Sequence, residues 1–351
     1  MILTYRFRLK DGNQRSKLKK LSGQINFVWN YANEIIRENW RRSRQYTTKN
    51  DLHALTKGSS KLLDINSQTI QAVAYECLLR VQKCKKRVRF RSARKHLGWT
   101  PFNGQTVKFH GGYIDYNGHR FRLWQHRKIP DGFVIKTGSF SEDARGRWYV
   151  NLCCEISDEH WFQEPSPHGS EIGIDPGTKS IMVTSEGEEF SRESVTKKYA
   201  QMLALAQRHR KKKRVRAIHA KIKNSRQDWN HKRSFELAKR YQTIFFGNAS
   251  SGKLGKTRMA KGVYDASWYE IKTFLSVKTL RRGGRLLEVN ERNSTVTCST
   301  CFERSGPSGL SGLGIREWIC THCGSAHSRD HNAAKNILRL GHETLSLRRK
   351  A

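Results

Sequence analysis

The chain has 351 residues, enough for two or three domains and a sizeable core. Its 67 Lys and Arg residues outnumber its 30 Asp and Glu residues, giving a formal net charge of +37. This surplus predicts a polyanionic partner, nucleic acid first and an acidic membrane surface second. No apolar run approaches the roughly 20 residues of a membrane-spanning helix, and the opening MILTYRFRLKDG alternates like a strand. We therefore expect an intracellular protein whose eight cysteines are thiols or metal ligands.

The first half of the chain predicts helices inserted into a β-rich segment. Residues 1–10 alternate as a half-buried strand, and residues 14–43 place apolar side chains at helical spacing. A second helix begins near Ser67, which we expect to be its N-cap, and ends in the basic stretch KCKKRVRFRSARK. Residues 100–155 hold short apolar runs between Gly-containing turns. That pattern predicts an all-β block, and we expect a small barrel that the first strand completes.

The second half alternates strands and helices after a linker at residues 158–170. EIGIDPGTKSIMVTSEGEEF predicts a strand, a tight turn and a second strand, and residues 194–240 predict long basic helices. An apolar strand containing TIFFG follows, then a helix near residues 266–282 and the strand GRLLEVNE. We see no internal repeat.

Four cysteines near the C-terminus have the spacing of a zinc ribbon. CSTC and CTHC are two Cys-x2-Cys turns separated by residues 302–319, 18 in number. Each turn presents two thiolates to one metal ion, and two turns complete a tetrahedron with no open position. We therefore predict one structural Zn²⁺, with His322 and His327 as spare candidates. The predicted ligands are Cys298, Cys301, Cys320 and Cys323.

Two aspartates stand at sites where carboxylates also occur for purely structural reasons. Asp175 in GIDPG follows an apolar strand on a tight turn, and Asp330 in SRDHNAAKNIL begins a helix. Turn formation and helix capping each explain one of them. Taken in order, however, GIDPG, the basic helices, the apolar strand, the two Cys-x2-Cys turns and RDHNAAKNIL resemble the transposon-encoded TnpB proteins, compact relatives of the Cas12 nucleases. SQTIQAVAYECLLRVQK and RQDWNHKRSFELAKRYQTI are also similar to that family.

The resemblance implies an RNA-guided DNA endonuclease. It implies a guide RNA and double-stranded target DNA as partners, recognition of a short adjacent DNA motif, and cleavage by a RuvC-type, RNase H-like domain. In such a domain an Asp, a Glu and an Asp hold two Mg²⁺ ions, because two-metal hydrolysis needs clustered carboxylates. The first and last match Asp175 and Asp330. A prokaryotic cytoplasm, with the protein at the nucleoid, is the implied location; the sequence leaves monomer and dimer both open.

The implied fold is α+β with interrupted domains. A WED-like β-barrel takes residues 1–12 and 95–157, and a REC-like helical bundle at 13–94 is inserted into it. The RuvC domain takes residues 171–297 and 324–342, and the zinc ribbon at 298–323 interrupts it. Residues 343–351 form a tail to which we assign no role.

The middle glutamate of the family pattern is missing. The apolar strand reads IFFGNAS, so Gly247 stands where the carboxylate is expected. We predict that Glu291, at the carboxyl end of the next strand, supplies the group, because sites in such sheets lie at carboxyl strand ends. Glu288 lies earlier, on the other face, and is the fallback. A nuclease-inactive guided binder acting as a repressor is the alternative, and a DNA-only resolvase or transposase is a third class.

Two sets of residues are candidates for nucleic-acid contact. The densest basic run begins RHRKKKR. A solvated helix face would explain such a run, but the large positive charge of the chain favours contact with phosphates. On the second helix, two glutamines one turn apart could read adenine edges, although solvation of the helix surface is the better explanation for them. The candidates are Arg208, Arg210, Lys211, Lys212, Lys213 and Arg214 in the basic run, and Gln68 and Gln71 on the helix.

Overall fold

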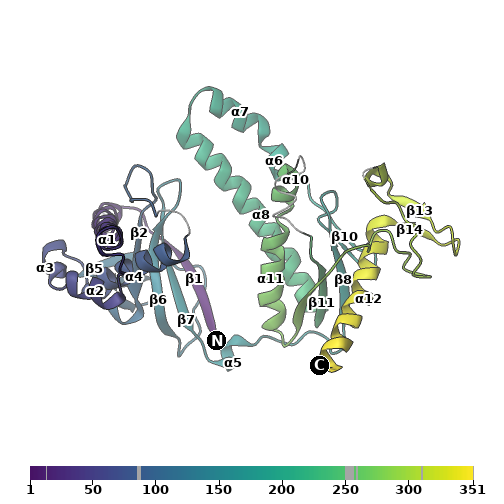
Figure 1. Ribbon diagram of the computed structural model, residues 1–351, viewed down its shortest axis with the longest axis horizontal. Coiled ribbons are helices and arrows are strands. Elements are labelled where there is room, and N and C mark those ends of the chain that lie inside the picture. Colours follow the sequence, from purple (N-terminus) through teal and green to yellow (C-terminus); the bar gives the residue numbers. More distant parts are fainter. Residues whose placement is uncertain (13, 85–87, 250–256, 258–259, 310, 351) are drawn as a thin grey trace. The chain divides into compact units, whose positions relative to one another are not determined.

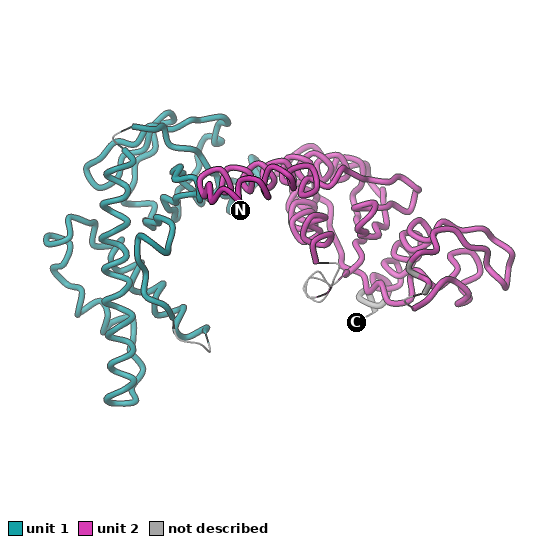
Figure 2. The backbone as a smooth tube through the Cα atoms, turned by 90° about the horizontal axis from the view of Figure 1, so that it is seen from above, with its two compact units in different colours: residues 1–161 teal, residues 162–351 magenta. Residues whose placement is uncertain are grey.

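The computed structural model describes the chain except for residues 13, 85–87, 250–256, 258–259, 310 and 351. It divides into two compact units, residues 1–161 and residues 162–351 (Figure 2). Each unit has its own sheet and its own buried core. No helix among the described residues is long and apolar enough to cross a membrane.

The first unit contains one seven-stranded antiparallel sheet in the order β2-β6-β7-β1-β5-β4-β3. The alternation of residues 1–10 predicts a strand, and β1 is one. It lies in the middle of this sheet, because it pairs with β7 and β5. The edge strands β2 and β3 are not paired with each other in the described part of the chain, so the expected closed barrel is not confirmed. The strands are β1 (Ile2–Leu9), β2 (Trp99–Asn103), β3 (Val107–Phe109), β4 (Tyr113–Tyr116), β5 (His119–Trp124), β6 (Val134–Glu142) and β7 (Trp148–Glu155).

Helices pack on this sheet and share its core. Leu18, Ile25, Val73 and Phe121 are among the fully buried side chains that join the helices to the strands. The second long helix has Asn66 as its N-cap, whose side chain accepts a hydrogen bond from the backbone of Gln68, so the expected Ser67 cap is wrong by one residue. The elements are α1 (Gln14–Ser43), α2 (Lys49–Leu55), α3 (Ser59–Leu63), α4 (Ser67–Lys83), η1 (Gly104–Thr106) and α5 (Asp158–Trp161), the last lying within the predicted linker.

The second unit is built on a five-stranded sheet in the order β10-β9-β8-β11-β12. β8, β11 and β12 run parallel to one another, and β9 and β10 continue the sheet antiparallel. The carboxyl ends of the three parallel strands therefore meet at one edge of the sheet. The strands are β8 (Glu171–Pro176), β9 (Met182–Thr184), β10 (Glu189–Phe190), β11 (Thr243–Gly247) and β12 (Arg285–Val289).

Helices cover both faces of this sheet (Figure 1). On one face, Ile174, Ile244 and Phe246 pack against α8, α10 and α11; on the other, Phe245 and Val289 pack against Ile337 of α12. Burial on both faces explains why β11 reads as a continuous apolar run. The helices are α6 (Val195–Lys198), α7 (Ala200–Arg208), α8 (Lys212–Arg240), α10 (Ala260–Ala266), α11 (Trp268–Leu280) and α12 (Arg329–Lys350), so α12 takes in most of the predicted tail.

A small cysteine-containing segment lies between β12 and α12. It contains η2 (Ser311–Gly314) and the hairpin of β13 (Glu317–Ile319) and β14 (Ala326–Ser328). The last strand leads directly into α12, so this segment is tied in sequence to the helix that carries Asp330.

Candidate active site

Asp175 lies near the carboxyl end of β8 and is almost completely buried, with 9% of its surface exposed. The strand alternates, so Ile172 and Ile174 face the core under α8 and α11 while Asp175 faces α12. The turn after the strand needs glycine, because a Cβ on Gly177 would lie 2.5 Å from the Ser180 carbonyl oxygen. The Trp268 indole donates to the Gly177 carbonyl at 2.9 Å and holds this turn.

Gly247 lies beside Asp175 on the neighbouring strand. Phe246 of β11 pairs with Ile174 of β8, so one residue further along, Gly247 is next to Asp175 on the face of α12. A Cβ built on Gly247 would lie 2.8 Å from Oε2 of Glu291. The Glu291 carboxylate therefore occupies the space into which a side chain at position 247 would extend.

Glu291 reaches this space from the loop after β12. Gly247 pairs with Val289, and Asn248 donates its backbone N–H to the Val289 carbonyl at 2.9 Å. The Asn248 side-chain oxygen then accepts the Glu291 backbone N–H at 3.3 Å. Gly247 thus makes room for the Glu291 carboxylate, and Asn248 orients the Glu291 backbone.

Glu288, the fallback, is directed away from the site. Leu286 of the same strand packs in the core beneath α8 and α11, and Glu288 shares its face by alternation. Its carboxylate forms an ion pair with Lys272 of α11. Geometry therefore favours Glu291 over Glu288 as the neighbour of Asp175.

Asp330 stands in the first turn of α12. The helix approaches β8 closely at Gly173, where a Cβ would lie 2.7 Å from the Leu338 backbone nitrogen. Asn332 and Asn336, both 1% exposed, donate from the same helix to the carbonyls of Ser294 and Thr297 at 2.7 to 3.3 Å. The helix that carries Asp330 thus also fixes the loop that follows Glu291.

The three carboxylates line one cleft of about 350 Å³. The pKa of Asp175 is raised well above its usual value, chiefly by burial and further by the charges of Glu291 and Asp330. Burial also raises the pKa of Glu291. Clustered, partly desolvated carboxylates repel one another unless a cation lies between them. Their oxygen atoms are the ligand type that Mg²⁺ prefers. Among the described residues, however, only the four cysteines bring three or more ligand atoms within 4.8 Å of one another.

Three basic side chains, Lys179, Arg316 and Arg329, border the same cleft. Arg316, from the loop before β13, places its Nη1 3.2 and 3.1 Å from the two carboxylate oxygens of Asp330. Arg329 donates its backbone N–H to the Arg316 carbonyl at 2.7 Å, and its guanidinium binds the Gly312 carbonyl. Sequence reasoning missed Arg316, since no spacing rule relates it to a residue 14 positions later across a hairpin.

The four predicted zinc ligands come together. Among the described residues they are the group of His, Cys, Asp and Glu side chains whose ligand atoms all lie within 4.8 Å of one another. The Ser305 hydroxyl donates to Cys320 Sγ at 3.0 Å, which lowers the pKa of Cys320 to about 6 and favours the thiolate that zinc binds. His327 lies 3.0 Å from Cys298 Sγ as a neighbour of the cluster. The cluster fits one structural Zn²⁺ with four sulfur ligands.

Comparisons with known proteins show what this chain is similar to. Residues 268–337, which include Glu291, the four cysteines and Asp330, match the family described as Cas12f1-like, TNB domain. A Streptomyces pristinaespiralis protein named "Putative RNA-guided DNA endonuclease" is 28% identical over 96% of this chain and 88% of its own. A mimivirus "TnpB-like protein L79" is 24% identical over 60% of this chain and 44% of its own. By these matches the chain is similar to TnpB-like proteins.

A solved relative of this TnpB-like chain shows the same fold at low identity. The Cas12f1 chain of a Cas12f1–sgRNA–target DNA complex superposes with a TM-score of 0.61 and 11% identity, over 96% of this chain and 98% of that one. The mixed α+β architecture is therefore that of Cas12f1, and the matched TNB domain contains the cysteine cluster.

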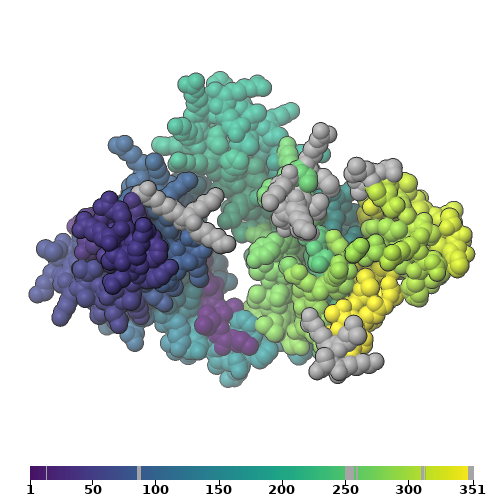
Figure 3. Space-filling model, in the orientation of Figure 1, coloured from purple at the N-terminus to yellow at the C-terminus, as the bar shows by residue number. Residues whose placement is uncertain are grey.

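The residues predicted to contact nucleic acid differ in how exposed their side chains are and in whether those side chains already have partners. All six basic candidates are exposed at the tip of the α7–α8 hairpin, which projects from the second unit (Figure 3), and none forms an ion pair with a described residue. The two glutamines are half-buried. Gln71 Nε2 lies 2.7 Å from His53 Nε2, and Gln68 has a buried side-chain oxygen with no partner in the described part of the chain. Neither glutamine is presented freely.

Proposed function

We propose that this chain is an RNA-guided DNA endonuclease whose cutting site is formed by Asp175, Glu291 and Asp330. The observation that carries the proposal is the position of the Glu291 carboxylate, which fills the space left by Gly247 beside Asp175. Gly247 of β11 has no carboxylate, but Glu291, which follows β12, supplies one, so three acids line one cleft. Without such a group, two aspartates would hold two metal ions poorly.

The topology of the second unit supports the nuclease assignment. Three parallel strands with two antiparallel strands beyond β8, flanked by α12 on one face, correspond to the arrangement of an RNase H-like domain. On this assignment residues 171–297 and 324–342 are the RuvC-type domain, and residues 298–323 are the inserted ribbon. In the first unit, the antiparallel sheet and α1–α4 take the WED-like and REC-like roles.

The chemistry follows from what the residues can hold. Asp175, Glu291 and Asp330 would bind two Mg²⁺ ions, which supply an activated water and neutralise charge on the scissile phosphate. Trp268 holds the Gly177 turn that directly follows Asp175 and Pro176. Asn248 fixes the Glu291 loop, and Asn332 and Asn336 fix the loop that follows it against α12. The nearly complete burial of Asp175 limits the access of bulk water to that carboxylate.

The charge of the chain supports nucleic-acid partners. The relatives are named for RNA-guided action on DNA, and we extend that to this chain with guide RNA and double-stranded target DNA as partners. In guided nucleases the protein holds the heteroduplex by its backbone and leaves sequence to base pairing. The exposed basic tip of α7 and α8, with no acidic partners among the described residues, suits such phosphate contacts.

The test is Mg²⁺-dependent cleavage of guide-matched DNA by the purified ribonucleoprotein. We expect cleavage by the wild type and by Glu288→Ala, and none by Glu291→Ala, with DNA binding retained in all three. Glu288→Ala is the matched control, because it removes a carboxylate three residues away that faces α11.

Other outcomes identify the competing functions. A wild-type protein that binds guided DNA but does not cut it would be a nuclease-inactive binder. DNA cleavage without any requirement for RNA would indicate a resolvase-like or transposase-like enzyme instead.

A further inference from the structure

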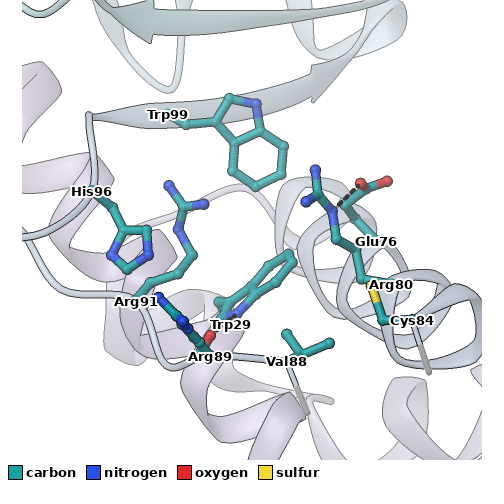
Figure 4. A pocket seen from close by; sticks show the side chains of 9 residues that line it. All are labelled: Trp29, Glu76, Arg80, Cys84, Val88, Arg89, Arg91, His96 and Trp99. Carbon is teal, nitrogen blue, oxygen red and sulfur yellow. Dashed lines mark hydrogen bonds and ion pairs between the residues drawn. The ribbon is translucent and has the colours of Figure 1, made fainter. Parts of the chain in front are cut away.

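The first unit contains a second cavity, far in sequence from the carboxylates. It has a volume of about 410 Å³ and lies between α1, the C-terminal end of α4, the segment 88–98 and the start of β2 (Figure 4). This is within the roughly 300–1,000 Å³ range of small-molecule pockets. None of the functions assigned above uses it.

The segment that walls this cavity is held in place by side chains of α1. The Asn30 amide binds both the carbonyl and the N–H of Arg91, at 2.9 and 2.7 Å. Asn33 donates to the Val88 carbonyl at 3.2 Å, and the Trp29 indole donates to the Arg89 carbonyl at 3.4 Å. A stretch without regular secondary structure is thereby fixed residue by residue, which is expected where side chains must be presented in a defined direction.

Two guanidinium groups point into the cavity. Arg91 lies against two indoles, 5.6 Å from the Trp29 ring centre and 5.5 Å from that of Trp99. Its guanidinium donates to the Asn26 side-chain oxygen at 2.9 Å and to the Leu97 carbonyl at 3.3 Å, but it forms no ion pair with a carboxylate of the described residues. Arg80 has only Glu76, at 3.5 Å. Burial, together with the charge of Arg80, lowers the pKa of Arg91. Glu76 is the one carboxylate among the residues that line the cavity, against the three arginines Arg80, Arg89 and Arg91, so the cavity carries excess positive charge.

The lining combines this positive charge with a flat aromatic surface. The Trp99 ring is half-buried, and in Figure 4 it and the guanidinium of Arg91 border the same space. Guanidinium groups bind phosphate through paired hydrogen bonds, and indole faces stack on nucleobases. Unstacked bases are bound by aromatic and Arg planes in this way, whereas paired bases are not accessible to them.

We propose that this cavity binds one unpaired nucleotide of a single-stranded nucleic acid, with its phosphate against Arg80 and Arg91 and its base on Trp99. The proposal rests on the nucleic-acid binding of the proposed function and not on cleavage. It therefore stands or falls independently of the carboxylate site.

The test is binding of labelled uridine hexamers, ribose and deoxyribose, to the full chain without Mg²⁺, beside hexamers that lack bases. We expect the wild type to bind a base-bearing hexamer about tenfold more tightly than the abasic hexamer with the same sugar, as stacking of one base predicts. This preference should hold for ribose, for deoxyribose or for both. Trp99→Leu should abolish this preference, and Trp124→Leu, at an exposed indole on β5, should retain it. A preference for the ribose hexamer places the nucleotide in the RNA partner.

Phosphate contact is tested by Arg80→Gln with Lys83→Gln as its control. Both remove one charge near the end of α4, and only Arg80 lines the cavity. We expect Arg80→Gln to weaken the binding of both base-bearing and abasic hexamers several-fold more than Lys83→Gln does. Equal weakening by the two variants would contradict the phosphate placement.

A crosslinking measurement on the wild type guards against misfolding of the Trp99 variant. A hexamer with one 4-thiouridine should crosslink under long-wavelength light to a peptide within residues 88–103. Crosslinks confined to other peptides, or equal affinity for base-bearing and abasic hexamers of both sugars, would overturn the proposal.

Discussion

At the scale of single residues, the site depends on which side chain enters the space next to Asp175. Gly247 has no side chain, and Glu291 fills its place from the loop that follows the adjacent strand, β12. The alternation of β12 decides between the two candidate glutamates, because Val289 and Leu287 pack towards α12 while Glu288 pairs with Lys272 on the opposite face. A shift of one residue in this strand would exchange those faces.

A first prediction concerns Arg316, whose guanidinium contacts both oxygens of Asp330. A metal ion bound at Asp330 must compete with this contact. The pair is partly exposed, and such pairs are worth about 0.2–1 kcal/mol, a factor of roughly 1.4 to 5 in an equilibrium constant. Arg316→Gln should therefore lower the Mg²⁺ concentration for half-maximal cleavage by up to about fivefold.

The control for this variant is Arg304→Gln, which removes an exposed charge from the same ribbon segment without touching the cleft. Its Mg²⁺ dependence should match that of the wild type. An unchanged or increased Mg²⁺ requirement for Arg316→Gln would show that the arginine does not compete with the metal.

At the scale of elements, the close approach of α12 to β8 places Asp330 near Asp175. Gly173 makes this approach possible, since a Cβ there would meet the backbone of Ala334 and Leu338. Gly173→Ala should push the helix away, lower the free energy of unfolding by about 1–3 kcal/mol, and reduce cleavage because Asp330 shifts with the helix. Urea unfolding and the cleavage assay measure the two effects.

Gly314→Ala is the matched control for this substitution. Nothing lies within 4 Å of a Cβ at that glycine, which belongs to the same unit. It should leave both stability and cleavage near the wild-type values. A Gly173→Ala protein of wild-type stability and activity would mean that the helix can yield without moving Asp330.

The sequence predicts these elements well where one periodicity dominates. The bounds of α1 follow from apolar spacing, and the face of Glu288 follows from the alternation of β12. Glu291 lies two residues beyond the end of that strand, so alternation alone does not fix its direction. The open sheet of the first unit could not be told from a barrel, because closure depends on whether edge strands far apart in the chain pair. The Arg316–Asp330 contact was equally hidden, since it depends on the three-dimensional path of the ribbon.

At the scale of the whole molecule, the net charge of +37 makes binding strongly dependent on salt. The exposed tip of α7 and α8 should account for part of that dependence. Replacing Lys211, Lys212 and Lys213 with Gln should reduce the slope of log affinity against log salt by about 2–3, because each phosphate contact contributes about 0.9. Titration of labelled duplex at several salt concentrations measures the slope.

The control for the tip is the same three-charge change at Lys17, Lys19 and Lys20, which are exposed on α1. It has the same effect on net charge without altering the hairpin. Equal slopes for the two triple variants would mean that the tip contributes only its charge and makes no particular phosphate contacts.

The most direct measurement of the central claim moves the carboxylate back to β11. Glu291→Ala removes the carboxylate beside Gly247, whose φ lies outside the left-handed region. A side chain there also requires small shifts of Pro176 and Ile337, whose atoms would lie 2.9 and 3.0 Å from its Cβ. We predict that guided, Mg²⁺-dependent cleavage is lost in Glu291→Ala and partly restored in Gly247→Glu/Glu291→Ala, with DNA binding intact in both. Full cleavage by Glu291→Ala alone would contradict the account, because Glu291 would then not be the third acid.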